Sequence, residues 1–466
     1  MKKIPLSALS LFAILLAACQ NTEIVAPSSV TLPAAFEQIN QAKGAEDIRR
    51  WWQNWHDSQL NRLIEQGLAN NLDIALAQAR LKEAQANSRA AEADRGPSVS
   101  AAGSAISGLN DLNSGVINPS ESRSHGIAGA IIASWEPDFF GQKRSDADAA
   151  TYAALAYQEQ VYAAQLLVSG QIAENYFKIY ATDQQSAVIN QTISTLMELQ
   201  RYIQGRFNAG QATAYEVNEI ATQLSALQAK QATLNAQSDS YQRSIAILLG
   251  QPPQGFRLVK RGNPLSNMPI APRGQQPATV IERRPDIRAN ARQVQAYSAK
   301  LASAKADLYP RFTLNFIGQG GRIELNNDLS FISGKGGLFG VGVQLPIFTN
   351  GRIEANIDAA DARLKGALIQ YDKTLLKALS EVDNAYQMQY ALLRQGNFLQ
   401  KAYAQAQKQA NDAQMLFKHG EKTLDVALRA KLNALDYQSQ RIQTQLAGAQ
   451  NLIGLYNALG GGWQAN

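Results

Sequence analysis

One cysteine and three histidines are the side chains whose chemistry can be judged directly from their positions. Cys19 is the only cysteine, so the chain can form neither an internal disulfide nor a metal–thiolate cluster. His56, His125 and His419 are scattered along the sequence, which argues against a histidine metal site. We also find no Ser-His-Asp constellation, no phosphate-binding glycine loop and no paired metal ligands, and therefore expect no enzyme activity. The chemistry that remains is acylation of the Cys19 thiol.

The N-terminus is organised like a secretion signal. Two lysines precede an apolar run over residues 6–16, which is too short to cross a bilayer as a permanent helix. The run closes on Leu-Ala-Ala directly before Cys19, and this tetrapeptide resembles the acylation motif of bacterial lipoproteins. We predict a signal peptide at residues 1–18 and a covalent lipid on Cys19. The following Gln20 favours the outer membrane, and an ordinary secretory signal is the alternative.

Charge and hydropathy exclude several classes of protein. The formal net charge is +6, and it falls to +4 when Lys2 and Lys3 leave with the signal, which provides no argument for nucleic-acid binding. No second apolar run approaches the length of a transmembrane helix. A membrane crossing by this chain would therefore have to use β-strands.

The sequence repeats itself at a constant offset of 210 residues. The matched pairs are Gly141 with Gly351, Phe207-Asn-Ala-Gly210-Gln-Ala-Thr213 with Phe417-Lys-His-Gly420-Glu-Lys-Thr423, and Leu249-Gly250 with Leu459-Gly460. Such a period is far too long for a solenoid. It predicts two structurally equivalent halves, each a large supersecondary unit.

Each half combines the helical period with the strand period. A helical pattern from Asp57 to Asp94 stops at Pro97, and alternating runs follow that place small polar and apolar residues on opposite faces. Proline-free stretches long enough for helices of roughly 95 Å come next. We predict a signal peptide at 1–18, followed by an acylated linker at 19–56. The first repeat covers 57–250, with a β-hairpin at 98–136 and helices at 143–207 and 213–249. A connecting region at 251–275 leads to the second repeat at 276–460, with a β-hairpin at 311–346 and helices at 352–417 and 423–458, and a tail at 461–466 ends the chain.

Four strands cannot close a barrel by themselves. The smallest stable barrels have about eight strands, and an open sheet edge in lipid would leave backbone groups unpaired. Two copies would supply a filled barrel and three would supply one with a lumen. A soluble hairpin region in a periplasmic coiled-coil protein is the alternative. The tryptophan cluster Trp51-Trp52-Gln-Asn-Trp55 is interpreted as a packing patch on the body.

Several motifs, taken in order, resemble the outer-membrane factors of bacterial efflux and secretion systems, in their TolC- and OprM-like lipoprotein branch. They are the Trp52/Trp55 cluster with Asn71-Leu-Asp73, Trp135-Glu-Pro-Asp-Phe-Phe-Gly141, Arg284-Pro-Asp286, Leu345-Pro-Ile-Phe-Thr-Asn-Gly351 and Ala458-Leu-Gly-Gly-Gly-Trp463. The resemblance implies an α+β membrane protein with two pseudo-repeats. It implies a homotrimer whose twelve-stranded outer-membrane barrel continues into a periplasmic helical barrel, with an equatorial region formed by the linker and the chain ends.

The implied function is passive conduction of small molecules that an inner-membrane pump delivers through a periplasmic adaptor. No cofactor is implied beyond the lipid on Cys19, and outer-membrane lipid is the remaining partner. A channel for type I protein secretion and a structural periplasmic coiled-coil lipoprotein stay open as alternatives. Few methionines and histidines argue weakly against copper or silver export, and the exported substrate is not indicated.

The resemblance also implies roles for the two hairpin tips. Adaptor contact falls on Arg206, Phe207, Gly210 and Thr213 in the first tip and on Phe417, Gly420 and Thr423 in the second. An acidic periplasmic gate falls on Asp425, with Glu216 and Glu219 at the corresponding depth of the first half. The family's second acidic position is Leu428 here, so we expect the ring of this half to be incomplete. Ordinary helix ends and solvated surface charge are the alternative interpretations.

Overall fold

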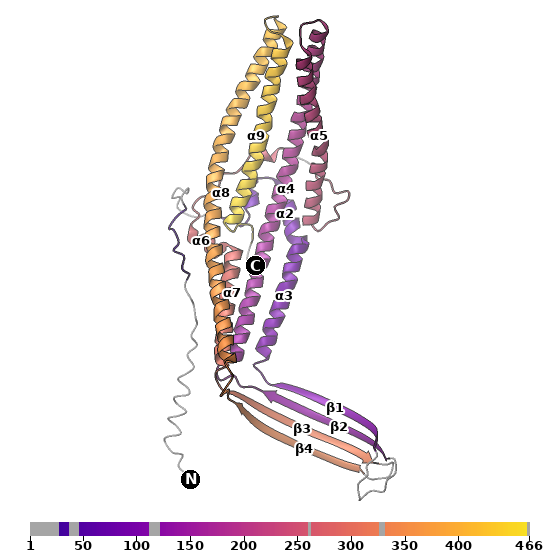
Figure 1. Ribbon diagram of the computed structural model, residues 1–466, viewed down its shortest axis with the longest axis vertical. Coiled ribbons are helices and arrows are strands. Elements are labelled where there is room, and N and C mark those ends of the chain that lie inside the picture. Colours follow the sequence, from indigo (N-terminus) through magenta and orange to yellow (C-terminus); the bar gives the residue numbers. More distant parts are fainter. Residues whose placement is uncertain (1–27, 37–45, 111–121, 260–261, 326–330, 464–466) are drawn as a thin grey trace. The chain divides into compact units, whose positions relative to one another are not determined.

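The computed structural model describes residues 28–36, 46–110, 122–259, 262–325 and 331–463. Cys19, the signal peptide and residues 20–27 and 37–45 of the predicted linker lie outside the described residues. The chain forms two compact units, and each unit takes segments from both repeats (Figure 1). The first unit contains residues 81–157 and 290–371, and the second contains residues 29–80, 158–289 and 372–466.

The first unit contains one antiparallel sheet with the strand order β1-β2-β3-β4. Its strands are β1 (Ser98–Asn110), β2 (Ser122–Trp135), β3 (Arg311–Leu325) and β4 (Phe331–Gln344). They have 13, 14, 15 and 14 residues, and they lie within the hairpin ranges 98–136 and 311–346 expected from the sequence. The central β2–β3 pairing joins the hairpins of the two repeats, and β1 and β4 remain as edge strands of this sheet.

The register of the strands separates apolar from polar side chains. One row across the sheet runs Val99, Ala133, Phe316 and Phe339, while the next row, on the other face, runs Ser98, Ser134, Asn315 and Gly340. The hydroxyl of Ser134 donates to the Asn315 side-chain oxygen at 2.9 Å. The separation is incomplete, because Ile132, Ile317 and Leu338 form an apolar row on that second face.

The expected helix from Asp57 to Asp94 is two helices, α2 (Ser58–Asn70) and α3 (Leu72–Ala93). Asn71 interrupts them with an extended backbone, and its side-chain oxygen accepts from the amides of Asp73 and Ile74. This is the capping geometry that the short Asn side chain favours over helix continuation. In the second repeat, α6 (Pro277–Arg283) and α7 (Pro285–Ala306) meet at Arg284, whose backbone is also extended.

Four longer helices complete the two repeats. They are α4 (Gln142–Asn208), α5 (Ala214–Leu248), α8 (Arg352–Lys418) and α9 (Leu424–Ala458), together with short 3-10 turns at Trp51–Trp55 and Pro264–Ser266. α4 and α8 each have 67 residues, and α5 and α9 each have 35. All begin 210 residues apart in matched pairs. The backbone thus reproduces the repeat that the sequence predicts.

The matched glycines adopt matched conformations. Gly141 and Gly351 have φ of +78° and +77°, and Gly250 and Gly460 have φ of +69° and +76°. A side chain is strained in this left-handed region, so each pair marks a turn that glycine permits. Gly170 serves a different purpose, because a Cβ there would lie 2.6 Å from the Asn457 side chain of α9. It allows α4 and α9 to approach closely.

The core of the second unit gathers around the predicted aromatic patch. Trp51, Trp52 and Trp55 are all buried, and Trp51 stacks on Tyr456 with ring centroids 5.3 Å apart. The interpretation of this cluster as packing is confirmed. Tyr176 of α4 lies in the same cluster, and its hydroxyl donates to Asp57 at 2.6 Å. The first unit has a smaller core that includes Leu301, Ala360 and Leu364.

The C-terminal Gly-Gly-Gly-Trp segment passes through a crowded part of the second unit. A Cβ on Gly461 would lie 2.7 Å from the Ile48 carbonyl oxygen, and one on Gly462 would lie 2.9 Å from Trp51. Trp463 then stacks on Tyr162 with ring centroids 4.4 Å apart. The glycines therefore let the tail reach this stacking position.

No helix in the described part of the chain is long and apolar enough to cross a membrane.

Candidate gate and docking site at the hairpin tips

The first tip joins α4 to α5 through a hydrogen-bonded turn. The Gly210 amide donates to the Phe207 carbonyl at 2.9 Å, and the Gln211 amide donates to the Arg206 carbonyl at 2.8 Å. With Gly210 at φ +72°, this is a Schellman motif, which satisfies carbonyls that a helix end leaves free. The Arg206 guanidinium donates back to the Gln211 carbonyl at 2.9 Å. The turn is therefore closed by both backbone and side-chain bonds.

The start of α5 is closed by a capping box. The Glu216 amide donates to the Thr213 hydroxyl oxygen at 3.3 Å, and the Thr213 amide donates to the Glu216 carboxylate at 2.7 Å. The Thr213 hydroxyl donates to the same carboxylate at 2.9 Å. These hydrogen bonds lower the pKa of Glu216 below its usual value. A carboxylate predicted for a gate thus also caps its own helix.

The second tip has the same backbone turn with different side chains. The Gly420 amide donates to the Phe417 carbonyl at 3.0 Å, the Glu421 amide donates to the Leu416 carbonyl at 2.9 Å, and Gly420 has φ +78°. Thr423 precedes α9 as its N-cap residue, but its side chain makes no capping hydrogen bond. The two tips are therefore alike in backbone and unlike in how their returning helices begin.

Exposure and charge also distinguish the tips. Phe207 is exposed, whereas Phe417 is only partly so. The first tip carries uncharged residues on either side of its glycine, and the second carries charged and titratable ones: Asn208, Ala209, Gln211 and Ala212 against Lys418, His419, Glu421 and Lys422. A partner that contacts both tips would meet two different surfaces.

The predicted gate carboxylates Asp425 and Glu216 occupy different positions in the first turns of their helices. Asp425 is the second residue of α9 and Glu216 the third residue of α5, so they point about 100° apart around their helix axes. At the 210-residue offset, the counterpart of Asp425 is Tyr215 rather than Glu216. One oxygen of Asp425 is buried without a hydrogen-bond partner in the described part of the chain. Glu219 accepts a hydrogen bond from Gln223 at 3.5 Å.

Leu428 occupies the position where the resemblance implied a second acidic residue, and its surroundings are apolar. It is 3% exposed and packs in a cluster with Leu196, Leu199, Ile203 and Ile220, which belong to α4 and α5. A carboxylate there would be buried among apolar side chains, at a high desolvation cost. In this single chain, Leu428 therefore joins the two hairpins near their tips.

Sequence reasoning missed Tyr215, the most exposed aromatic residue near the tips, at 77% exposed. It follows the N-cap Thr213 by two residues, outside the apolar stripe of its helix. That position was its only signal in the sequence. Among the residues that the structure describes, no group of three or more His, Cys, Asp or Glu side chains could hold a metal ion.

The repeat, the open sheet and the paired hairpins agree with a comparison to known families. The model of the family described as outer membrane efflux protein matches residues 63–251 and 277–461. The chain belongs to this family. It is 26% identical over 458 residues to the pyoverdine export outer membrane protein OpmQ of Pseudomonas aeruginosa, covering 97% of this chain and 96% of that protein. It is 29% identical to the outer membrane protein OprJ of the same species, covering 91% of this chain and 88% of OprJ.

A solved structure shows the same fold. The open state of the MtrE outer membrane channel of Neisseria gonorrhoeae matches with a TM-score of 0.78 and 22% identity, over 94% of this chain and 97% of MtrE. The predicted fold class is confirmed. This member of the outer membrane efflux protein family is an outer-membrane channel component of an efflux system, and the family consists of channels rather than enzymes.

Proposed function

We propose that this efflux protein is a homotrimeric outer-membrane duct. It conducts small molecules passively after an inner-membrane pump and a periplasmic adaptor have delivered them. The observation that carries the proposal is the four-stranded sheet with β1 and β4 as its edge strands. Unpaired edge groups are costly in lipid, so further copies must pair with them. Two copies would enclose a lumen filled with side chains, whereas three would leave room for a solute.

The hairpin tips are the proposed docking site for the adaptor. Gly210 and Gly420 present bare backbone at the two turns, and the side chains beside them are exposed. Bare backbone permits close approach by another chain. The residues beside the turn glycine are uncharged in the first tip and mostly charged in the second, which supports a partner with two distinct contact surfaces.

The proposed gate contains Asp425, whose buried and unpartnered oxygen would be repeated three times around a threefold axis. Rings of carboxylates attract cations and bias conduction. Asp425→Ala should therefore raise the single-channel conductance or change cation selectivity in planar bilayers. Val426→Ala, next along the helix, is the matched control. Unchanged conductance and selectivity in both Asp425→Ala and Glu216→Ala would remove the gate assignment.

The proposed anchor is a lipid on Cys19, which would hold the N-terminus in the outer membrane. One relative is named for pyoverdine export, and this supports export of a low-molecular-weight compound over secretion of a polypeptide. We therefore rank type I secretion second. A purely structural role in the periplasm ranks third, because it leaves the open sheet edges unexplained.

Planar-bilayer recording on the purified full-length protein tests the proposal. We expect stepwise conductance from a species whose mass corresponds to three chains. A monomeric species without conductance would refute the proposed homotrimeric duct. Export assays in cells that lack the channel would separate small-molecule efflux from type I secretion, since type I secretion requires a polypeptide in the medium.

A further inference from the structure

In each repeat, a hydrogen bond joins the C-terminal end of the second hairpin helix, α5 or α9, to the residue that precedes a shorter helix, α3 or α7. Asn71, between α2 and α3, donates from its side-chain nitrogen to the carbonyl of Leu248 in α5 at 3.0 Å. Arg284, between α6 and α7, donates from Nη1 to the carbonyl of Ala458 in α9 at 3.0 Å. The two acceptors, Leu248 and Ala458, are 210 residues apart. The two junctions are therefore structural counterparts.

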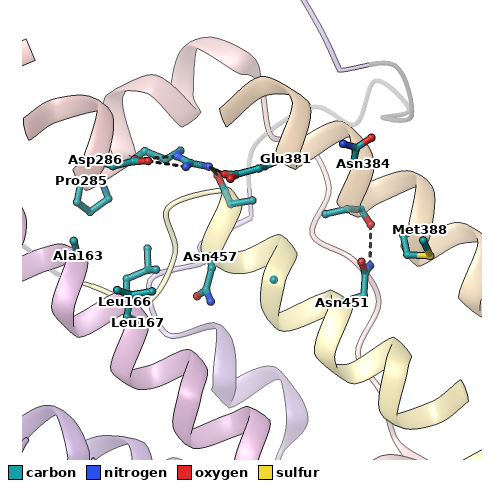
Figure 2. Close-up of a pocket in the computed structure, with 14 residues that line it drawn as sticks. Ala163, Leu166, Leu167, Pro285, Asp286, Glu381, Asn384, Met388, Asn451 and Asn457 are labelled. Carbon is teal, nitrogen blue, oxygen red and sulfur yellow. Dashed lines mark hydrogen bonds and ion pairs between the residues drawn. The ribbon is translucent and has the colours of Figure 1, made fainter. Parts of the chain in front are cut away.

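The second junction is ionic and the first is not. Arg284 pairs with Asp286 through Nε at 3.0 Å and Nη2 at 2.7 Å, and with Glu381 of α8 through Nη1 at 2.8 Å (Figure 2). By contrast, Asn71 is neutral. The residue of α4 at the 210-residue offset from Glu381 is Gln171, which is also neutral and is exposed. Among the residues that the structure describes, it is the second repeat that joins its long helix to the junction through opposite charges.

The cluster is stable in its ionised form. The Arg284 side chain is 9% exposed, so burial works against its charge. Asp286 and Glu381 outweigh that effect and raise the pKa of the guanidinium, and the same pairing lowers the pKa of Asp286. The cluster borders a cavity of about 690 Å³ between α4, α8 and α9 (Figure 2). Removing one partner would leave charge behind in a partly desolvated site, which is costly.

We propose that Arg284, Asp286 and Glu381 form an ionic lock that fixes α8 to the junction of α9 with α7. The α8–α9 hairpin is thereby restrained at this level, whereas the described part of the chain shows no equivalent charged restraint on the α4–α5 hairpin. Because α8 and α9 also carry the second tip, where the gate and the adaptor docking site are proposed, the lock limits movement of this end of the channel, its entrance. That last consequence rests on the proposed function, whereas the lock itself does not.

Glu381→Gln tests the lock, since it removes the charge and keeps the shape of the side chain. Hydrogen–deuterium exchange on the purified channel should become about three- to tenfold faster for amides 377–385 of α8 and 454–458 of α9. Amides 244–248 of α5 should be unaffected. Lys377→Gln is the matched control, because the Lys377 ammonium lies 3.6 Å from the same carboxylate but is largely exposed. It should change these exchange rates by less than about twofold.

The outcomes separate the lock from the channel assignment. Equal exchange in wild type and Glu381→Gln would overturn the lock, and so would equal effects of Glu381→Gln and Lys377→Gln. Faster exchange in α5 of the Glu381→Gln variant would overturn the inference that the lock acts on the second repeat alone. If Glu381→Gln does not fold, Asp286→Asn provides the same comparison.

A wild-type protein without conductance would refute the proposed function, while the exchange result would still decide the lock. In a conducting wild type, Glu381→Gln should add fluctuations between conductance levels, and an unchanged current record would overturn the link to the entrance.

Discussion

Leu428 offers a direct test of how the two hairpins are held together near their tips. Its side chain is 3% exposed and touches apolar residues of α4 and α5. Replacing a buried leucine by alanine costs about 2–5 kcal/mol, and the lower end applies where neighbours can close the space, as they can near a helix end. We therefore expect Leu428→Ala to lower the free energy of local opening by about 2–3 kcal/mol.

Hydrogen–deuterium exchange measures this opening directly, because amides of a locally opened segment exchange together. A loss of about 2 kcal/mol corresponds to roughly 30-fold faster exchange. The acceleration should appear in residues 196–203 of α4 and 217–224 of α5, as well as around the substitution. Val426→Ala is the control, since Val426 lies on the same helix but is 40% exposed. It should change exchange by less than about threefold.

Leu428→Asp places a carboxylate where the family resemblance implies a second acidic position, and it should open the tips further than Leu428→Ala. A carboxylate in this apolar cluster would lack a partner, and that cost adds to the lost packing. The reasoning would be refuted if Leu428→Ala left exchange in residues 196–203 within about twofold of wild type. It would also be refuted if Leu428→Asp proved as protected as the wild-type protein.

Four further outcomes are expected. Thr213→Ala should speed exchange in the first turn of α5 about fivefold, since such a cap is worth about 1 kcal/mol, while Thr423→Ala should have less effect in α9 because that side chain caps nothing. The pKa of Glu216 is lowered by its bonds to Thr213, so its cap should persist above the usual glutamate pKa and weaken as pH falls through the lowered value, as followed by its carboxyl chemical shift. Trp463→Ala removes a ring stack and a cation–π contact and should lower the thermal midpoint by a few degrees, with Trp463→Phe recovering part of it. Cys19→Ser should abolish metabolic labelling with a fatty acid and reduce export, and persistent labelling would exclude the predicted anchor.

Local signals in the sequence were sufficient to predict most of the helices and strands and their repetition in the two halves. Glycine at a turn, proline at a helix start and alternation in a strand act over a few residues, so the constant offset of 210 residues predicted matched helices and hairpins. The same signals located the turns at Gly210 and Gly420. They failed at Asn71, where a continuous apolar pattern hid a break that the amide side chain stabilises.

The amino-acid sequence by itself thus determined two equivalent halves, the ends of their four long helices and an alternating sheet that one chain cannot close. Only the tertiary structure decided which residues meet across large separations. It placed Glu381 beside Arg284, 97 residues away, and buried Leu428 against the opposite hairpin. Those contacts depend on which helix faces pack together, and charge or hydrophobicity at one position does not specify its partner. For that reason the sequence could propose Asp425, Glu216 and Glu219 as gate carboxylates, but it could not show that one Asp425 oxygen is buried.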